Sequence, residues 1–333
     1  MTRLNERCAL VTGGHGFLGS HVVDLLLEEG FTVRCLLRPG RAESALGGRP
    51  VAVVRGDLRR PEGLAEAVRG VHYVFHVAGL VAARSPAEFR AVNADGAGRL
   101  AAAARGEGGG LQRFVLVSSQ AAAGPSRDGL PVTEDLPPNP LTHYGRSKLL
   151  GEEAVRASGI PFTILRPPAI YGPRDVALLP LFRLASKGLW PGLEGPGRRF
   201  NLLHARDVAR GILLAAEAEG ARGRTYFLSD GPGYGYPDVA RSMGRAFGRR
   251  TRRVPVPDFA LDLAAAVSDE VMSLLGRAAV FSRDKARDLK GRLWLCSAAR
   301  AEAEIGWRPL VALDDGTKET ADWYRRNGLL GRA

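Results

Sequence analysis

Two side chains in this 333-residue sequence could perform acid/base chemistry together. Tyr144 and Lys148 are four positions apart, so on a helix the phenol and the ammonium share one face. A free tyrosine has a pKa of about 10, which is too high for efficient proton transfer at neutral pH. A neighbouring ammonium favours the phenolate and lowers that pKa. The pair therefore predicts an acid/base tyrosine with a supporting lysine.

A pair of serines precedes this motif by about 25 residues. Ser118 and Ser119 follow an apolar run that ends at Val117 and is expected to be a buried strand. Serine at the carboxyl end of such a strand faces the crevice where open α/β sheets bind their ligands. A hydroxyl there could hold the oxygen of a substrate alcohol or ketone while the tyrosine moves the proton. Hydride chemistry at that carbon is the expected reaction.

The N-terminal part of the chain carries a glycine-rich turn between an expected strand and an expected helix. It runs Thr12-Gly13-Gly14-His15-Gly16-Phe17-Leu18-Gly19. Gly13 permits the tight turn, Gly16 lets the backbone approach a pyrophosphate, and Gly19 is expected to let the helix pack close to the sheet. The free N–H groups of the helix would face the phosphates. We therefore expect Gly13, Gly16, Phe17 and Leu18 to bind a dinucleotide.

The sequence near the expected adenosine end points to the choice of cofactor. About twenty residues after the turn, where a carboxylate would bind the adenosine ribose, the chain has Arg38 and no acid. An arginine there can bind a 2′-phosphate, which favours NADP, and NAD stays open. The simpler alternative is that Arg38 only stacks on the adenine.

Alternating strand-like and helix-like segments predict the element order of the first half. Strands are expected at 8–11, 31–37, 51–55, 71–77, 114–117 and 162–165, and helices at 17–29, 61–68, 86–105 and 144–157. This alternation predicts an α/β fold with a doubly wound (Rossmann) parallel sheet of six or seven strands. Residues 1–170 are expected to form the dinucleotide-binding domain, with a strand and a helix added from about 200–230. Residues 171–333 would mostly form a smaller substrate-binding cap.

Composition excludes several other classes of protein. The net charge is +12, but the arginines are scattered and form only short clusters, Arg249-Arg250 and Arg252-Arg253. A nucleic-acid binder would concentrate them with aromatic residues, so nucleic-acid binding is not expected. The three cysteines have no metal-ligand spacing, and no metal is expected. No apolar run reaches about 18 residues, and no secretory segment is recognised, so a cytoplasmic protein without an integral membrane segment is expected.

These motifs together resemble the extended short-chain dehydrogenase/reductases, also called the NAD-dependent epimerase/dehydratase family. The GxxGxxG spacing and the Tyr144-Gly145-Arg146-Ser147-Lys148 motif carry the resemblance. It assigns the catalytic role to Ser119, with Ser118 as the second candidate. It also implies that Asp57, beside Leu58, meets the adenine; the alternative is a loop carboxylate that caps the helix expected at 61–68.

The resemblance extends over most of the chain and implies further contacts. Segment 76–79 would line the cofactor through Val77, Ala78 and Gly79, while His76 is expected to pack or to bond to backbone. Pro167 and Ala169 would bracket the nicotinamide, and Asn93 would steady the sheet. The resemblance also implies a homodimer through the helices at 86–105 and 144–157. Segments 206–209 and 305–309 resemble two further motifs of the family.

Substrate class is the least determined property. The residues Ser119-Gln120-Ala121 lack the acid that a 4,6-dehydratase needs, and the stretches 176–182 and 259–280 are apolar. An apolar cap suits an apolar substrate, although each apolar side chain could equally serve the core or a dimer face. The expected function is NAD(P)-dependent oxidation or reduction of a hydroxysteroid- or dihydroflavonol-like substrate. The alternatives are a nucleotide-sugar epimerase, with Arg174, Arg198 and Arg199 as diphosphate ligands, and a cofactor-sensing regulator.

Overall fold

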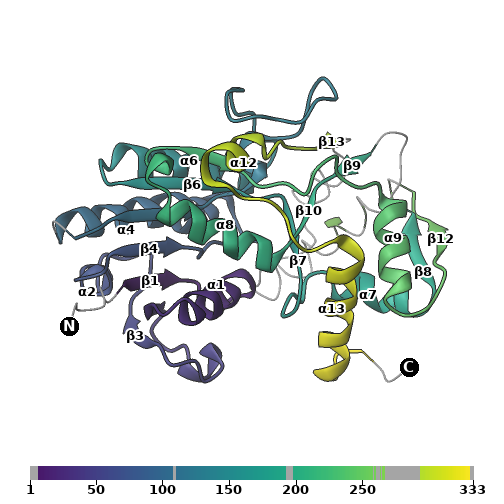
Figure 1. Cartoon of the computed structure of the whole chain (residues 1–333), viewed down its shortest axis with the longest axis horizontal. Helices are drawn as coiled ribbons and strands as arrows, with labels where there is room; N and C mark the ends of the chain where they lie inside the picture. The colour runs from purple at the N-terminus through teal and green to yellow at the C-terminus, as the bar shows by residue number, and fades with distance from the viewer. Residues whose placement is uncertain are drawn as a thin grey trace.

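A seven-stranded parallel sheet forms the centre of the molecule (Figure 1). The structure, a computed structural model, describes residues 7–107, 110–192, 198–257 and 293–330, together with 259, 263, 265 and 266. The strand order is β11-β6-β5-β4-β1-β2-β3. The strands are β1 (Cys8–Thr12), β2 (Thr32–Leu37), β3 (Ala52–Arg55), β4 (Tyr73–His76), β5 (Arg113–Val117), β6 (Phe162–Arg166) and β11 (Thr225–Phe227).

The strand order reverses between β1 and β4. From β1 the chain builds outward through β2 and β3, then returns to the other side of β1 and continues through β4, β5, β6 and β11. Ligands of doubly wound sheets bind at this switch point, beyond the carboxyl ends of the strands. The glycine turn after β1 and the segment after β4 both lie there. The predicted fold class is therefore confirmed.

Helices cover both faces of the sheet and bury alternate strand residues. Helices α1 (Phe17–Glu28) and α8 (Ala205–Glu217) pack on one face with Ala9 and Val11. Helices α2 (Leu64–Val68), α4 (Asp95–Gly106) and α6 (His143–Ala157) pack on the other face with Leu10. The period-2 alternation of a strand explains why adjacent residues enter different cores.

Two expected helices were wrong in extent. The helix expected at 61–68 begins only at Leu64, because Gly63 before it takes a left-handed φ of 79°. The helix expected at 86–105 is divided into α3 (Pro86–Phe89), a π-helical turn η2 (Arg90–Ala94) and α4. Widened turns of this kind are rare and are frequently found at functional sites, and this one contains Asn93.

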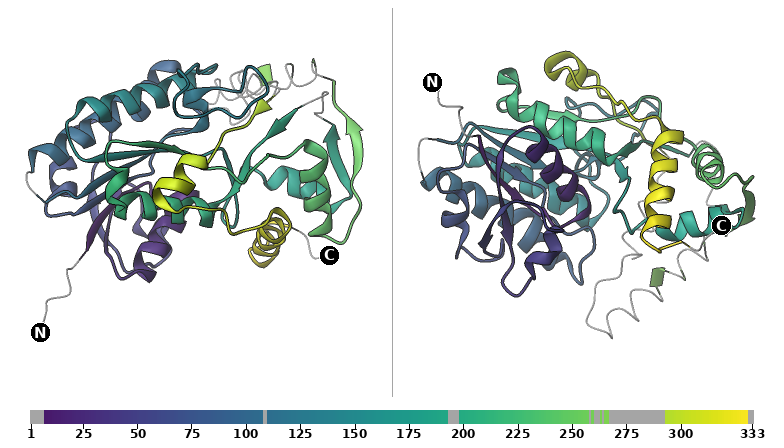
Figure 2. Two further views of the ribbon diagram at one scale, coloured as in Figure 1. Left: turned by 45° about the horizontal axis from the view of Figure 1, so that its top comes forward. Right: turned by 60° about the horizontal axis from the view of Figure 1, so that its bottom comes forward.

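A second, smaller lobe lies beside the lobe that contains the central sheet (Figure 2). It has a hydrophobic core of its own. Its elements are β7 (Ala169–Tyr171), α7 (Leu179–Ser186), β8 (Leu189–Gly192), β9 (Arg199–Phe200), β10 (Leu202–His204), α9 (Tyr236–Arg245), β12 (Arg252–Pro255), β13 (Leu293–Trp294) and α13 (Leu313–Arg326). Leu179 and Phe182 are buried in that core. Their packing role explains part of the apolar stretch 176–182, while Val176 is exposed.

Four shorter elements complete the described secondary structure. They are η1 (Glu43–Leu46), α5 (Gln120–Ala123), η3 (Glu219–Ala221) and α12 (Ala299–Ile305). Most of the apolar stretch 259–280 lies outside the described residues; within it Phe259 and Leu263 are exposed and Ala265 is buried. Among the described helices, none is both long enough and apolar enough to cross a bilayer.

Candidate active site

The glycine turn has the backbone geometry of a phosphate-binding loop. Gly13 adopts a left-handed φ of 75°, and the Gly16 N–H donates to the Gly13 carbonyl at 2.8 Å. A Cβ on Gly13 would lie 2.9 Å from backbone atoms of Ala78, and a Cβ on Gly19 would lie 2.0 Å from the Gly13 oxygen. Gly19 therefore makes room for the turn itself, which corrects the expectation that it serves helix–sheet packing. Side chains are excluded where a pyrophosphate would lie.

Helix α1 begins at this turn with its first N–H groups free of side-chain caps. Gly16 is the residue before the helix and has no side chain, and the first turn contains no acid. Phe17 is half-buried and Leu18 is buried as the helix starts. The exposed positive end of the helix dipole is suited to an anionic group.

The segment after β4 is tied to the glycine turn. Thr12 Oγ1 accepts from the Ala78 N–H at 3.2 Å and lies 2.7 Å from His76 Nδ1. The Thr12 hydroxyl and the His76 imidazole therefore share a buried hydrogen bond beside the amide of Ala78. Burial lowers the pKa of His76 to about 3, with the Lys148 charge adding to the effect, so His76 is neutral. It bonds to a side chain, whereas the sequence predicted packing or a backbone partner.

Cationic side chains gather at the adenosine end of the turn. Arg38 directly follows β2 and is exposed, as is Arg41. Burial lowers the pKa of His15, and the charges of Arg41 and Arg38 lower it further, which places all three side chains near one another. His15 Nδ1 is buried without a hydrogen-bond partner among the described residues.

Asp57 and Leu58 occupy the next loop along the sheet edge. The Asp57 carboxylate accepts from the backbone N–H of Arg59 at 3.0 Å and pairs with its guanidinium at 2.6 Å. These hydrogen bonds hold the pKa of Asp57 below its usual range. Asp57 therefore does not cap a helix, since α2 starts seven residues later. Leu58 is buried, and a Cβ on Gly96 would lie 3.0 Å from its own Cβ.

The two candidate serines have different surroundings. Ser118 is buried and donates its hydroxyl to Glu152 Oε1 at 2.6 Å. Ser119 is partly exposed and caps α5, where its Oγ accepts from the Ala121 N–H at 3.1 Å. The Ser119 hydroxyl proton is left to donate to a ligand. The sequence ranked Ser119 above Ser118 only through the family resemblance, and the structure adds a physical difference between them.

Helix α6 carries Tyr144 and Lys148 and contacts the chain on both sides of Ser119. Lys148 Nζ donates to the Val117 carbonyl at 2.8 Å. Two residues beyond Ser119, the Ala121 carbonyl lies so close to α6 that a Cβ on Gly145 would be 2.3 Å from its oxygen. The three predicted catalytic residues are thereby brought into one neighbourhood.

The surroundings of Tyr144 and Lys148 differ in polarity. The ring of Tyr144 is partly buried and packs 6.0 Å from that of Phe89. Burial lowers the pKa of Lys148 to about 8, and the negative charge of Glu152 opposes that effect. A Cβ on Gly79 would lie 3.0 Å from Lys148 Nζ, so the glycine after β4 leaves room for the lysine.

A buried ion pair beneath this site was missed at the sequence level. Glu152, one turn after Lys148, binds Arg166 through two hydrogen bonds of 2.9 and 2.7 Å and also accepts from Ser118. Both charged side chains are almost fully buried. Arg166 immediately precedes Pro167, whose carbonyl accepts from the Gln120 N–H at 2.8 Å. The only signal of this ion pair in the sequence was the four-residue spacing between Lys148 and Glu152.

Asn93 connects the loop after β4 to α6. Its amide exchanges hydrogen bonds with the Leu80 backbone, at 2.8 and 2.9 Å, and donates to Ser147 Oγ at 3.0 Å. A Cβ on Gly151 would lie 2.3 Å from the Asn93 carbonyl oxygen. The π-helical turn around Asn93 therefore fits against a glycine of α6. This arrangement holds the helix that bears Tyr144.

Segments 206–209 and 305–309, which resemble family motifs, are far apart in sequence and meet near the cap. The Asp207 carboxylate accepts from the backbone N–H groups of Leu310 and Val311 at 3.0 and 2.9 Å. The indole of Trp307 donates to the Asp207 carbonyl at 2.9 Å. Arg206, where the family pattern has an acid, pairs with Glu319 at 2.6 Å. Both segments therefore have a structural role in docking α13.

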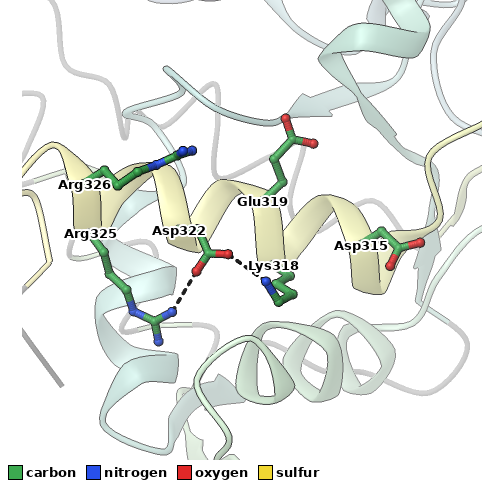
Figure 3. Close-up of a pocket in the computed structure, with 6 residues that line it drawn as sticks. All are labelled: Asp315, Lys318, Glu319, Asp322, Arg325 and Arg326. Atoms are coloured by element: carbon green, nitrogen blue, oxygen red, sulfur yellow. Dashed lines mark hydrogen bonds and ion pairs between the residues drawn. The ribbon is translucent and has the colours of Figure 1, made fainter.

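The two residues predicted to bracket the nicotinamide follow β6. Pro167 is buried, whereas Ala169 is exposed at the start of β7, which leaves the sheet and pairs with β10. The hollow drawn in Figure 3 contains none of the predicted site residues. It lies along α13, and there Asp322 pairs with both Lys318 and Arg325. It is a solvated helix face.

A switch point with a glycine cradle, beside a tyrosine–lysine pair, defines an enzyme that works with a nicotinamide nucleotide. The chain belongs to the NAD dependent epimerase/dehydratase family, whose model matches residues 9–228. This confirms the resemblance inferred from the motifs.

Characterised relatives agree with this assignment. The chain is 35% identical over 322 residues to a ceramide reductase of Caulobacter vibrioides, covering 96% of this chain and 95% of that protein. It is 30% identical to a sterol-4-alpha-carboxylate 3-dehydrogenase (decarboxylating) of Mus musculus, covering 96% and 91%. It also resembles the crystal structure of a Thermus thermophilus UDP-glucose 4-epimerase complexed with NAD, with a TM-score of 0.75, 25% identity and coverage of 96% and 99%.

Proposed function

We propose that this protein oxidises or reduces a secondary alcohol or ketone on a fairly apolar substrate. The observation that carries this proposal is that α6 contacts the chain on both sides of Ser119, at Val117 and at Ala121. These contacts bring Ser119 close to Tyr144 and Lys148. Two of the relatives are named for a ceramide and for a sterol, both lipids. They favour the apolar substrate expected from the sequence over a nucleotide sugar.

In this proposal each catalytic side chain has one task. The Ser119 and Tyr144 hydroxyls donate to the substrate oxygen and fix its position. In the reductive direction Tyr144 gives its proton to that oxygen, and in the oxidative direction it takes the proton back. The Lys148 ammonium favours the phenolate that remains and would bond the nicotinamide ribose. The bound nicotinamide supplies or accepts the hydride.

Replacing Tyr144 tests the catalytic assignment. Tyr144→Phe is expected to abolish turnover, because the proton donor is lost, and to leave the dissociation constant of the cofactor within about twofold. Tyr73→Phe is the matched control, since Tyr73 bonds to Gln112 at the opposite end of the sheet. The readout is nicotinamide absorbance for turnover and fluorescence titration for binding. Normal turnover by Tyr144→Phe would end the proposal.

We propose the glycine turn, Asp57, Leu58, the segment 77–79, Pro167 and Ala169 as the cofactor contacts, with NADP as the preferred cofactor. Arg38 and Arg41, near His15, support a 2′-phosphate. NAD enzymes have a carboxylate near the adenosine ribose, and this chain has positive charge there instead. A charge-assisted hydrogen bond is worth about 1.5–3 kcal/mol. Arg38→Ser should therefore weaken NADP binding roughly tenfold to a hundredfold and leave NAD binding unchanged. Arg222→Ser, also exposed, is the control, and equal losses for both cofactors would contradict this preference.

Ligand-induced stabilisation separates the substrate classes. With the cofactor present, a hydroxysteroid at about a hundred times its dissociation constant should stabilise the protein by about 2.7 kcal/mol. For a chain of this length that corresponds to a rise in Tm of roughly 4 °C. UDP is expected to give no shift, because Arg174, one expected diphosphate ligand, already pairs with Asp24 at 2.6 Å. A shift with UDP alone would favour the epimerase alternative.

We further propose a homodimer in the cytoplasm. Helices α4 and α6 would form its interface, as the family resemblance implies, and the exposed Leu150 on α6 is available for such packing. The three cysteines are free thiols, which suits a reducing compartment. Light scattering at the mass of a single chain would contradict the dimer.

A further inference from the structure

The outer end of the cap carries a two-stranded ribbon formed by β8 and β12 (Figure 1). We call residues 186–192 and 248–255 the basic ribbon; they comprise β8, β12 and the loops that lead into them. The Arg252 N–H donates to the Gly188 carbonyl at 2.7 Å, which brings the two loops side by side. The strands pair in parallel, with Arg252 opposite Leu189 and Val254 opposite Pro191. The ribbon lies at the edge of the cap, away from the central sheet.

The two faces of the ribbon differ. Trp190 is buried in the core of the cap, whereas its neighbour Leu189 is 37% exposed. Arg252 shares a face with Leu189 because opposed residues of paired strands point the same way, and Val254, two residues further, joins them. Val254 is 45% exposed. The outer face therefore alternates a cation with apolar side chains.

Among the described residues, most of the exposed cations of the basic ribbon have no acidic partner. Stretches 183–192 and 244–257 contain no acidic residue, and their cations are Arg183, Lys187, Arg245, Arg249, Arg250, Arg252 and Arg253. Lys187, Arg249, Arg250 and Arg252 are exposed, and within the described part of the chain none of these four forms an ion pair. By contrast, Arg245 at the end of α9 pairs with Asp314 at 2.7 Å. The ribbon is a concentrated part of the excess positive charge.

We propose that the basic ribbon docks the protein onto the anionic surface of a lipid bilayer. Clustered cations with interleaved apolar side chains match a bilayer interface, where the cations meet lipid phosphates and the apolar groups reach below them. A surface for single-stranded nucleic acid would instead need exposed aromatic side chains for stacking, and the one aromatic residue of the ribbon, Trp190, is buried. The docking goes beyond the proposed function. The docking would give the enzyme access to a lipid substrate, and this part of the inference rests on the proposed function.

Vesicle flotation tests the docking without any substrate. The full-length protein is mixed with vesicles of phosphatidylcholine alone or with about one third phosphatidylglycerol, at low and at high salt. Binding is expected only to the anionic vesicles and should fall steeply with salt. Each cation near such a surface contributes about fivefold to partitioning, so the triple variant Lys187→Gln, Arg250→Gln, Arg252→Gln should bind roughly a hundredfold more weakly.

A charge-matched variant controls for the high net charge of the chain. Arg127, Arg222 and Arg308 are exposed and, among the described residues, have no ion pair, so their triple replacement by Gln changes the net charge equally. It should bind like the wild type. Equal loss in both triple variants, or no binding to anionic vesicles, would overturn the proposal. Competition by duplex or single-stranded DNA that depends on the ribbon would assign it to nucleic acid instead.

Turnover measured on a water-soluble ketone keeps this test separate from the proposed function. The ribbon variant should retain wild-type turnover there, since its residues lie outside the Ser119–Tyr144–Lys148 neighbourhood. Vesicle binding without any hydride transfer would reject the proposed function and leave the docking intact. Hydride transfer without vesicle binding would reject the docking alone.

Discussion

Lys148 is expected to destabilise the cofactor-free protein at neutral pH. The side chain is buried, and burial lowers its pKa from the ordinary 10.5 to about 8. At about 1.4 kcal/mol per pH unit, holding the ammonium in the native state costs about 3 kcal/mol. Lys148→Met keeps most of the volume and removes the charge, but also removes the hydrogen bond to the Val117 carbonyl, worth about 1 kcal/mol. The variant should be about 2 kcal/mol more stable at pH 7 and catalytically inactive.

The pH dependence of this effect has a definite sign. Between about pH 8 and pH 10.5 the unfolded lysine binds a proton that the native one has lost, so wild-type stability gains about 3 kcal/mol across that window. The Met variant lacks this gain. Its advantage of about 2 kcal/mol at pH 7 should become a disadvantage of about 1 kcal/mol near pH 10.5. Urea unfolding of both proteins at each pH gives the difference, in which all other titrating groups cancel.

Lys187→Met is the control, because Lys187 is exposed and its replacement should change stability by less than about 0.5 kcal/mol at either pH. A Lys148→Met protein that is less stable than the wild type at pH 7 would refute the reasoning. So would a stability difference that does not change between the two pH values. Either outcome would mean that Glu152 and the backbone compensate fully for burial.

Two substitutions test the packing around the site. Gly145→Ala should cost at least about 2 kcal/mol and slow turnover, because its Cβ would meet the Ala121 oxygen, whereas Gly106→Ala, in open space at the end of α4, should be neutral or stabilising by up to about 1 kcal/mol. Urea unfolding compares them, and similar costs for both would argue against the close approach. Glu152→Gln should cost about 3–5 kcal/mol, since it leaves the charge of Arg166 buried without a partner. For 333 residues that lowers Tm by roughly 4–7 °C in calorimetry, and an unchanged Tm would contradict the assigned pair.

Local patterns in the sequence determined much of the fold. The glycine turn, the alternation of apolar strands with amphipathic helices and the four-residue spacing of Tyr144 and Lys148 each depend on a few adjacent residues. The sequence therefore predicted the doubly wound sheet and the shared face of the two side chains. It overestimated the helices at 61–68 and 86–105, because the left-handed Gly63 and the partners of Asn93 are not visible in periodicity.

Tertiary structure decided what depends on residues far apart in the chain. The family resemblance ranked Ser119 above Ser118, but only the structure shows that Glu152, 34 residues away, engages Ser118. Similarly, the 206–209 and 305–309 segments meet across 100 residues through Asp207 and Trp307. A pattern of a few residues encodes local backbone geometry, whereas the partner of a buried polar group depends on which distant element packs against it. For that reason the sequence by itself determined the class of chemistry and ranked the two serines, and only the folded chain showed which partners each of them has.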